Sequence, residues 1–240
     1  MNLIEYGQRL HASGMISGAD GNLSVRLRED RILITPSGFP KAEITPRDIV
    51  VVDIEGQIYG QGTPSSELDM HLAVYRERED INAVIHAHPP YTIASSLQEG
   101  MKFDFVPEVI VSLGGVFLAD YARPGTPDVS RSFSDALSNH NTFILAKHGS
   151  LTLGRDLQQS FNRLENLEHN AKIAMIALSG GQLPSLPTPE ITALEQSNVA
   201  IQSVNHPIHG ESHLRISDEE VLIEQLHSHC LNIPGNNPAR

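Results

Sequence analysis

Short stretches rich in apolar residues occupy much of the first half of the chain, and they predict a set of β-strands. The clearest is Leu23-Ser24-Val25-Arg26-Leu27, where apolar and polar residues alternate directly after the turn-forming residues Asp20-Gly21-Asn22. The strands predicted from such runs cover residues 23–27, 31–35, 48–54, 57–59, 83–88, 106–113 and 142–147.

Helical spacing takes over between and after these strands. Apolar residues recur every three or four positions from Leu157 to Leu178, and Gly180-Gly181 ends the pattern. The segment Pro64-Ser65-Ser66-Glu67 begins another helix, with a proline and serines at its start and an acid in its first turn. Helices are predicted over 3–13, 64–78, 91–97 and 157–178, after the proline-containing linker at 182–190, and from Ser217 onward. Interleaved strands and helices favour an α/β sandwich with a largely antiparallel sheet between helices. We expect one domain over residues 1–240, in which 190–240 form a C-terminal helical extension or tail.

Composition and charge exclude several classes of function. The chain has 240 residues, a formal net charge of −12, 5% aromatic residues and no tryptophan. This balance argues against a nucleic-acid partner, because cationic contacts to phosphate dominate such binding. The single cysteine, Cys230, excludes an intrachain disulfide and every cysteine-rich zinc module. We find no signal peptide and no apolar run that could cross a bilayer, so we expect a soluble, cytoplasmic protein without a membrane partner.

The run Ile85-His86-Ala87-His88-Pro89 is the first candidate for chemistry. Residues two apart on a strand face the same side, so both imidazoles would point toward one place, and Pro89 ends the strand there. Alone, such a pair is more often two polar residues on a solvent-facing edge. A third histidine, His148, also follows an apolar strand, and three imidazoles with an open fourth position are typical of a catalytic zinc site.

Acidic and small polar residues supply the other candidates. Glu67 could act as a general acid or base, although a carboxylate at a helix N-terminus is favourable in any protein. Ser65 and Ser66 could be ordinary helix caps, or they could bind phosphate together with free backbone N–H groups at the helix start.

Five motifs in sequence order resemble the class II aldolase/adducin family, and most closely its L-fuculose-phosphate aldolase branch. They lie within residues 5–180 and read Gly21-Asn22-Leu23-Ser24, Thr35-Pro36-Ser37-Gly38, Ser65-Ser66-Glu67, His86-Ala87-His88 and Lys147-His148-Gly149. The resemblance implies a three-layer α/β/α sandwich, commonly a homotetramer with active sites at subunit interfaces. It also implies that zinc or another divalent metal is bound by His86, His88 and His148, that Glu67 is the catalytic acid/base, and that the substrate phosphate is held by Asn22, Ser37, Gly38, Ser65 and Ser66.

The reaction implied by the resemblance is a retro-aldol cleavage of a small ketose 1-phosphate. The metal would stabilise an enediolate, and Glu67 would return the proton to give dihydroxyacetone phosphate and an aldehyde. A tyrosine of these enzymes, which protonates the aldehyde oxygen, has no counterpart near Val111, and Tyr121 fits better as a structural residue. Alternatives on the same site are a dehydratase, a decarboxylase or an epimerase of a related sugar phosphate, although the epimerases of the family carry aspartate in place of Glu67. A non-enzymatic alternative is an adducin-like interaction domain, which is expected to lack the metal ligands.

The remaining histidines carry less weight. His71 lies one helical turn after Glu67, and we expect a packed or exposed helix residue rather than a fourth ligand. The cluster His206, His209 and His213 falls in an expected tail. His227 and His229 lie two apart on an expected helix, where side chains diverge.

Overall fold

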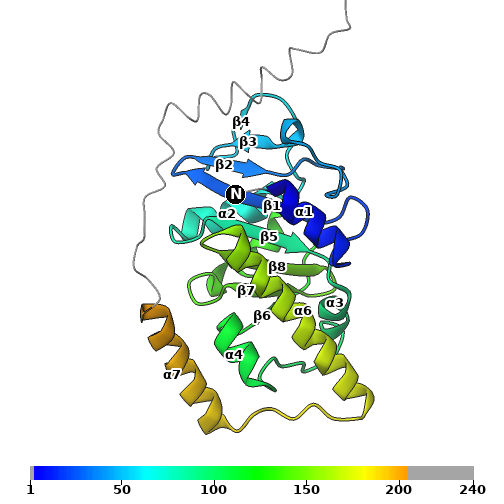
Figure 1. Cartoon of the computed structure of the whole chain (residues 1–240), viewed down its shortest axis with the longest axis vertical. Coiled ribbons are helices and arrows are strands. Elements are labelled where there is room, and N and C mark those ends of the chain that lie inside the picture. Colours follow the sequence, from blue (N-terminus) through cyan, green and yellow to red (C-terminus); the bar gives the residue numbers. More distant parts are fainter. Residues whose placement is uncertain (1–2, 205–240) are drawn as a thin grey trace, which may run out of the picture.

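An eight-stranded sheet forms the centre of the protein (Figure 1), and the computed structural model describes residues 3–204. The strand order across the sheet is β4-β3-β2-β1-β5-β8-β7-β6. The strands are β1 (Asn22–Arg28), β2 (Arg31–Ile34), β3 (Val50–Val52), β4 (Ile58–Tyr59), β5 (Ala83–Ala87), β6 (Phe117–Ala119), β7 (Thr142–Leu145) and β8 (Gly149–Gly154). The pairing of β6 with β7 is parallel, and every other pair in the described sheet is antiparallel.

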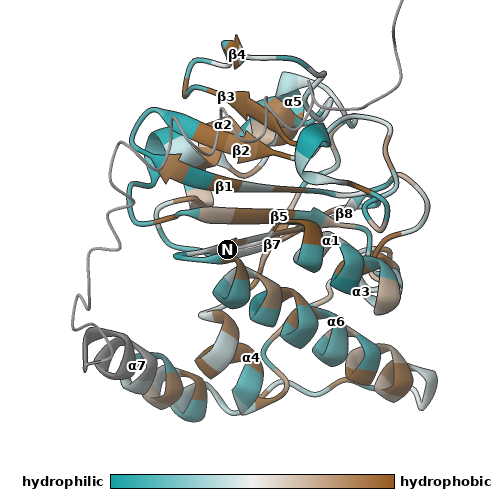
Figure 2. Cartoon of the chain, turned by 45° about the horizontal axis from the view of Figure 1, so that its top comes forward, coloured by the Kyte–Doolittle hydropathy of each residue, from teal (hydrophilic) through white to brown (hydrophobic). Residues whose placement is uncertain are grey.

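Helices cover both faces of this sheet. The α-helices of the described part of the chain are α1 (Leu3–Ala12), α2 (Leu68–Glu77), α3 (Pro90–Ser95), α4 (Pro107–Leu113), α5 (Pro127–Arg131), α6 (Leu157–Ser179) and α7 (Thr188–Val204), of which α7 packs against α4. The long helix α6 packs with α1, α3 and α4 on one face, while α2 and α5 pack on the other. Brown and teal residues intermix along α6 (Figure 2), as expected for a helix with one buried face. The predicted three-layer α/β/α sandwich with a largely antiparallel sheet is confirmed.

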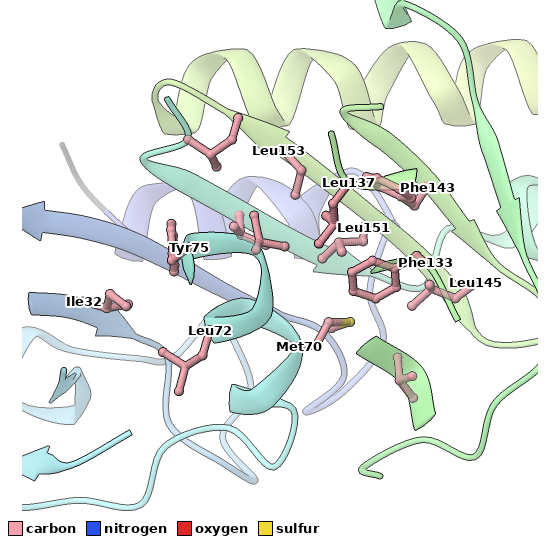
Figure 3. Packing of buried hydrophobic residues seen from close by; sticks show 14 of the residues in the cluster. Ile32, Met70, Leu72, Tyr75, Phe133, Leu137, Phe143, Leu145, Leu151 and Leu153 are labelled. Atoms are coloured by element: carbon pink, nitrogen blue, oxygen red, sulfur yellow. The ribbon is translucent and has the colours of Figure 1, made fainter. Parts of the chain in front are cut away.

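Side chains alternate between the two faces of the sheet along β5, so this strand contributes to the hydrophobic packing on both faces. Ala83, Ile85 and Ala87 join the hydrophobic cluster beneath α1 and α6, whereas Val84 joins the cluster beneath α2. Figure 3 shows this second cluster, in which Met70, Leu72 and Tyr75 of α2 pack against the sheet. His86 has the same parity as Val84, so its ring lies on the α2 face of the sheet.

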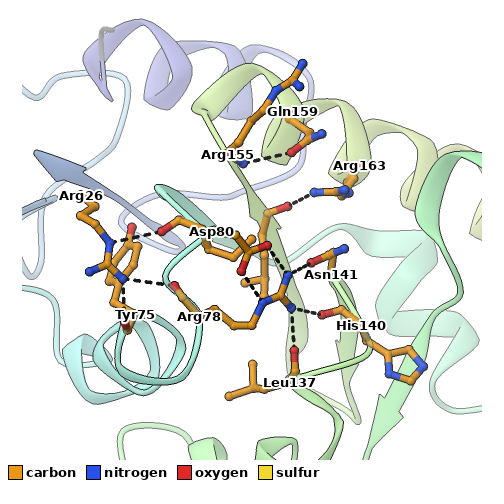
Figure 4. A network of polar contacts seen from close by, with 12 residues as sticks. Arg26, Tyr75, Arg78, Asp80, Leu137, His140, Asn141, Arg155, Gln159 and Arg163 are labelled. Atoms are coloured by element: carbon orange, nitrogen blue, oxygen red, sulfur yellow. Dashed lines mark hydrogen bonds and ion pairs between the residues drawn. The ribbon is translucent and has the colours of Figure 1, made fainter. Parts of the chain in front are cut away.

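Two arginines fix the C-terminal end of α2 (Figure 4). The Arg26 guanidinium donates hydrogen bonds to the carbonyl oxygens of Tyr75 and Arg78, at 2.6 and 3.2 Å. Arg78 pairs with Asp80 and donates to the Leu137 carbonyl at 2.7 Å and to the Asn141 side chain at 3.0 Å. Cations are favourable at a helix C-terminus, and these contacts anchor α2 to the sheet at the end opposite Glu67.

One element prediction is wrong. Residues 106–113, predicted as a strand, form helix α4, with Pro107 in its first turn and Gly114 as its left-handed C-cap. An apolar run of this length does not by itself distinguish a buried strand from a buried helix, and the proline was the signal that favours a helix. The strands β6 and β8 and the helix α5 were not predicted. The predicted helix from Ser217, the histidines from His206 onward and Cys230 lie outside the described residues.

Among residues 3–204, no helix has both the length and the apolar character needed to cross a membrane.

Replacing Arg78 with alanine should lower the free energy of unfolding by about 2–3 kcal/mol, because buried carbonyl groups would lose their donor. Urea unfolding followed by circular dichroism measures the change. The matched control is Arg131→Ala, which removes a largely exposed ion pair with Asp128 and should change stability by less than about 0.5 kcal/mol. Equal losses for the two variants would contradict the anchoring role of Arg78.

Candidate active site

The three predicted metal ligands meet at one end of the sheet, on the α2 face. His86 is fully buried on β5, and His88 follows directly after that strand. His148 lies in the turn between β7 and β8, where its backbone N–H donates to the Leu145 carbonyl. The ring centroids are 4.8 Å apart for His86 and His88, 4.8 Å for His86 and His148, and 5.1 Å for His88 and His148. Ligand nitrogen atoms of the three rings all lie within 4.8 Å of one another.

The turn that carries His148 needs a glycine next to it. A Cβ atom on Gly149 would meet the Ala87 carbonyl oxygen and would lie 2.8 Å from the His88 ring and 3.2 Å from the His86 ring. Lys147 has a positive φ of 61° and an exposed side chain. The strand β7 ends at Leu145, two residues earlier than predicted. The turn that follows brings His148 next to His86 of β5.

A hydrogen bond outside the cluster orients the ring of His86, and a carboxylate lies near the ring of His88. Nδ1 of His86 lies 2.8 Å from the Ser150 carbonyl oxygen, which can only accept, so Nδ1 carries the proton and donates. In the neutral ring Nε2 then holds a free lone pair, the usual arrangement for a metal ligand. Nδ1 of His88 lies 3.6 Å from an Asp20 carboxylate oxygen. Burial, followed by the charges of His86 and His148, lowers the pKa of His88 to about 4, which favours the neutral ring.

Glu67 precedes α2 and directs its carboxylate at this cluster. One oxygen, Oε2, lies 3.1 Å from Nε2 of His86 and accepts a hydrogen bond of 2.9 Å from the Asn22 amide. The other, Oε1, lies 3.3 Å from Nε2 of His148. Burial alone would raise the pKa of Glu67, but the neighbouring His86 and the contacts with His148 and Asn22 hold it well below its usual range. Glu67 is therefore an ionised, largely buried carboxylate at neutral pH, and although it occupies the N-cap position of α2, its side chain makes no capping bond.

The unpaired atoms of the cluster fit a divalent cation. Within the described part of the chain, Oε1 of Glu67 and Nδ1 of His148 are buried without a hydrogen-bond partner. Nε2 of His86 and Nε2 of His88 lie only 2.9 Å apart, a separation that requires a proton or a cation between their lone pairs. Three imidazoles with room for a further ligand are the donor set of catalytic zinc sites. The residues present thus fit the metal that the resemblance implies.

A cavity of about 420 Å³ opens next to the cluster. Eight of the nine predicted site residues line it: Asn22, Ser37, Gly38, Ser65, Ser66, Glu67, His88 and His148. His86 lies behind them, without exposure. The two loops that carry the serines are paired, because Ser65 N–H donates to the Thr35 carbonyl and Ser37 N–H donates to the Thr63 carbonyl. Asn22 differs from the other predicted phosphate ligands, since one N–H of its amide is already bonded to Glu67.

Sequence reasoning missed Lys41, which also lines the cavity. Its side chain is 1% exposed, and Nζ donates to the carbonyl oxygens of Ala19 and Phe39, at 2.9 and 2.7 Å. Burial lowers its pKa, while the nearby Asp20 acts in the opposite direction. An ammonium group has three N–H donors, so one remains for a ligand. A lysine seven residues after the end of β2 carries no pattern that would have pointed to this position.

Tyr121, which the sequence favoured as a structural residue, does not line the cavity, and its side chain is 60% exposed.

Comparison with known proteins agrees with this geometry. Residues 1–175 match the family described as the class II aldolase and adducin N-terminal domain. The chain belongs to the class II aldolase family. A 3-oxo-tetronate 4-phosphate decarboxylase from Haemophilus influenzae is 31% identical over 198 residues, which cover 80% of this chain and 94% of the relative. A 5-deoxy-D-ribulose 1-phosphate aldolase from Bacillus thuringiensis serovar kurstaki is 35% identical over 197 residues, with 80% and 91% of the two chains covered.

Solved structures of class II aldolases share the fold. An L-fuculose 1-phosphate aldolase superposes with a TM-score of 0.75 and 37% identity, over 81% of this chain and 93% of that chain. These relatives are enzymes, and this member of the class II aldolase family has three histidines that could hold a metal ion. It is therefore an enzyme, and the alternative of an adducin-like interaction domain is set aside.

Replacing Gly149 with alanine should displace the rings of His86 and His88 and reduce the divalent metal content of the purified protein to a small fraction of one ion per chain. Elemental analysis measures this content. Gly180→Ala is the control, because Gly180 ends α6 with a φ of −85° and a side chain there is compatible with the backbone. Unchanged metal content in Gly149→Ala would contradict the close packing of this turn against the metal site.

Proposed function

We propose that this protein is a zinc-dependent aldolase that cleaves a small ketose 1-phosphate to dihydroxyacetone phosphate and an aldehyde. The observation that carries the proposal is one buried carboxylate, Glu67, which contacts His86 and His148 beside a cavity lined by hydroxyl groups and a buried lysine. The aldolase relatives named above act on sugar phosphates of this class.

The two ends of the cavity would have different tasks. Ser37, Gly38, Ser65 and Ser66 offer small side chains and hydroxyl donors to a phosphate group, and Asn22 has one amide N–H left to offer. Lys41 adds a positive charge at the same wall, which favours an anionic substrate. The substrate would thus be bound by its phosphate, with its ketone and neighbouring hydroxyl directed toward the histidines.

Zinc, when bound, would supply a Lewis acid that stabilises negative charge on the substrate oxygens. His86, His88 and His148 would hold it. In the cleavage direction the hydroxyl proton at the aldehyde-forming carbon would pass through water to the Glu67 carboxylate, the carbon–carbon bond would break, and the electron pair would remain on the carbon next to the ketone. Glu67 would deliver a proton to that carbon, and in the reverse direction the same carboxylate would remove it. The contacts with Asn22 and His86 keep this group oriented.

A decarboxylase of a sugar-acid phosphate is the second candidate. The 3-oxo-tetronate 4-phosphate decarboxylase relative aligns over 94% of its own length, and no tyrosine is found among the described residues that line the cavity. Both reactions leave an electron pair next to a ketone and require its protonation, so the same metal, carboxylate and phosphate site could serve either.

Glu67→Gln should retain about one metal ion per chain, because the three imidazoles remain, but kcat should fall about 10²–10⁴-fold through loss of the proton carrier. Asp69→Asn is the control, since Asp69 is exposed in the first turn of the same helix. Full turnover in Glu67→Gln would remove Glu67 from the mechanism.

A substrate panel distinguishes the two candidate reactions. Ketose 1-phosphates, their dephosphorylated analogues and 3-oxo-tetronate 4-phosphate are assayed with metal present, and dihydroxyacetone phosphate and carbon dioxide are measured separately. We expect dihydroxyacetone phosphate from a ketose 1-phosphate and little from its dephosphorylated analogue. Carbon dioxide without dihydroxyacetone phosphate would instead identify a decarboxylase.

A further inference from the structure

A chain of buried polar side chains leads away from the active site, behind Asn22. His71 and Tyr75 of α2 and Ser24 of β1 follow one another, and each is at most 2% exposed. Nε2 of His71 contacts the Asn22 amide oxygen, Nδ1 lies 2.6 Å from Ser24 Oγ, and Ser24 Oγ lies 2.8 Å from the Tyr75 hydroxyl. None of these three side chains is placed among the metal or phosphate ligands, so the role of the chain is open.

The direction of each hydrogen bond in this series of side chains is set by the Glu67 carboxylate, at which the series ends. A carboxylate can only accept, so the nitrogen of the Asn22 amide faces Glu67 and the oxygen faces His71. That oxygen also only accepts, so Nε2 of His71 must carry a proton. Burial, followed by the charge of His86, lowers the pKa of His71 to about 3, so the ring is neutral and Nδ1 is unprotonated.

The remaining bonds then have one possible direction. Ser24 donates its hydroxyl proton to Nδ1 of His71 and therefore accepts from Tyr75. Burial raises the pKa of Tyr75, which keeps its hydroxyl protonated as this arrangement requires. Each buried group is satisfied in one arrangement only: Tyr75 donates to Ser24, Ser24 to His71, His71 to Asn22 and Asn22 to Glu67.

This arrangement opposes rotation of the Asn22 amide. If the amide turned over, its oxygen would face the Glu67 carboxylate and its NH₂ group would face the N–H of His71, so two contacts would become repulsive. His71 thus holds the amide in the orientation that keeps a donor on Oε2 of Glu67. Because that oxygen also lies 3.1 Å from His86, a shift of the carboxylate would be felt directly at the metal site.

We propose that His71 is a positioning residue for proton transfer by Glu67, which acts by donating from Nε2 to Asn22 and thereby fixes the Asn22–Glu67 hydrogen bond. The proposal rests on the function proposed above for Glu67. It differs from the simpler prediction of a packed helix histidine, because a residue that only fills space could be replaced by an apolar one of similar volume.

His71→Leu tests this difference. We expect kcat to fall about 10–100-fold, as is typical when a group that orients a functional residue is lost, while KM and metal content stay close to those of the wild type. His71→Gln should restore kcat to within a few-fold, because its carboxamide can both donate to Asn22 and accept from Ser24. Val74→Ala is the matched control, since Val74 is buried on the same helix outside the chain and should lower Tm without a comparable loss of kcat.

Several results would overturn the proposal. They are wild-type kcat in His71→Leu, equal kcat in the Leu and Gln variants, or losses of kcat in His71→Leu and Val74→Ala that simply follow their losses of Tm. If the Leu variant does not fold, Ser24→Ala takes its place, because it removes the donor to Nδ1 of His71. Unchanged kcat in this variant would contradict the proposed role of the hydrogen-bonded side chains.

A spectroscopic measurement is independent of turnover. In ¹⁵N-histidine NMR spectra of the full chain, His71 should remain neutral with its proton on Nε2 from pH 8 to pH 5, and a charged ring or a proton on Nδ1 would refute the assignment. The same spectra separate the two proposals. Full turnover in Glu67→Gln would end the role of Glu67 and the positioning role with it, whereas the wrong tautomer of His71 would end only the latter.

Discussion

The register between β1 and β5 is the constraint on which the site depends. It places Asn22 opposite His86 and Ser24 opposite Val84, on the face that α2 covers. A slip of one residue would turn Asn22 and Ser24 toward α1 and α6 and leave Glu67 without its donor. Two arginines at the far end of α2 and hydrophobic packing along it hold the helix on this face. Glu67 and His71 can therefore contact side chains of β1 and β5.

Charge distribution explains why these residues occur together. A buried carboxylate is costly unless other groups compensate it, and here two imidazoles and an amide surround Glu67. A bound cation would complete this compensation and would leave the carboxylate poised next to the substrate. The anionic end of the substrate would lie at the other wall, where Lys41 supplies a positive charge in a protein whose net charge is strongly negative. In the proposed function, the cavity would thus have a metal end and a phosphate end.

Much of this site could be predicted from local patterns, because strand ends and helix starts are visible in the sequence. The alternation around His86, the strand before His148 and the proline–serine start before Glu67 marked those residues as candidates, and the resemblance to the class II aldolase/adducin family gave them their predicted roles. Residues 106–113 were mistaken for a strand, since an apolar run fits either element and the proline was given too little weight. The contact of Lys41 with Ala19 and that of His71 with Asn22 join residues 22 and 49 positions apart, which no local pattern reveals.

Anomalous diffraction at the zinc absorption edge, on crystals of the zinc-loaded protein, tests the central claim most directly. The account predicts one strong peak within about 2.0–2.1 Å of a ring nitrogen of each of His86, His88 and His148. A peak elsewhere, or zinc-loaded crystals with no peak among these three rings, would contradict it.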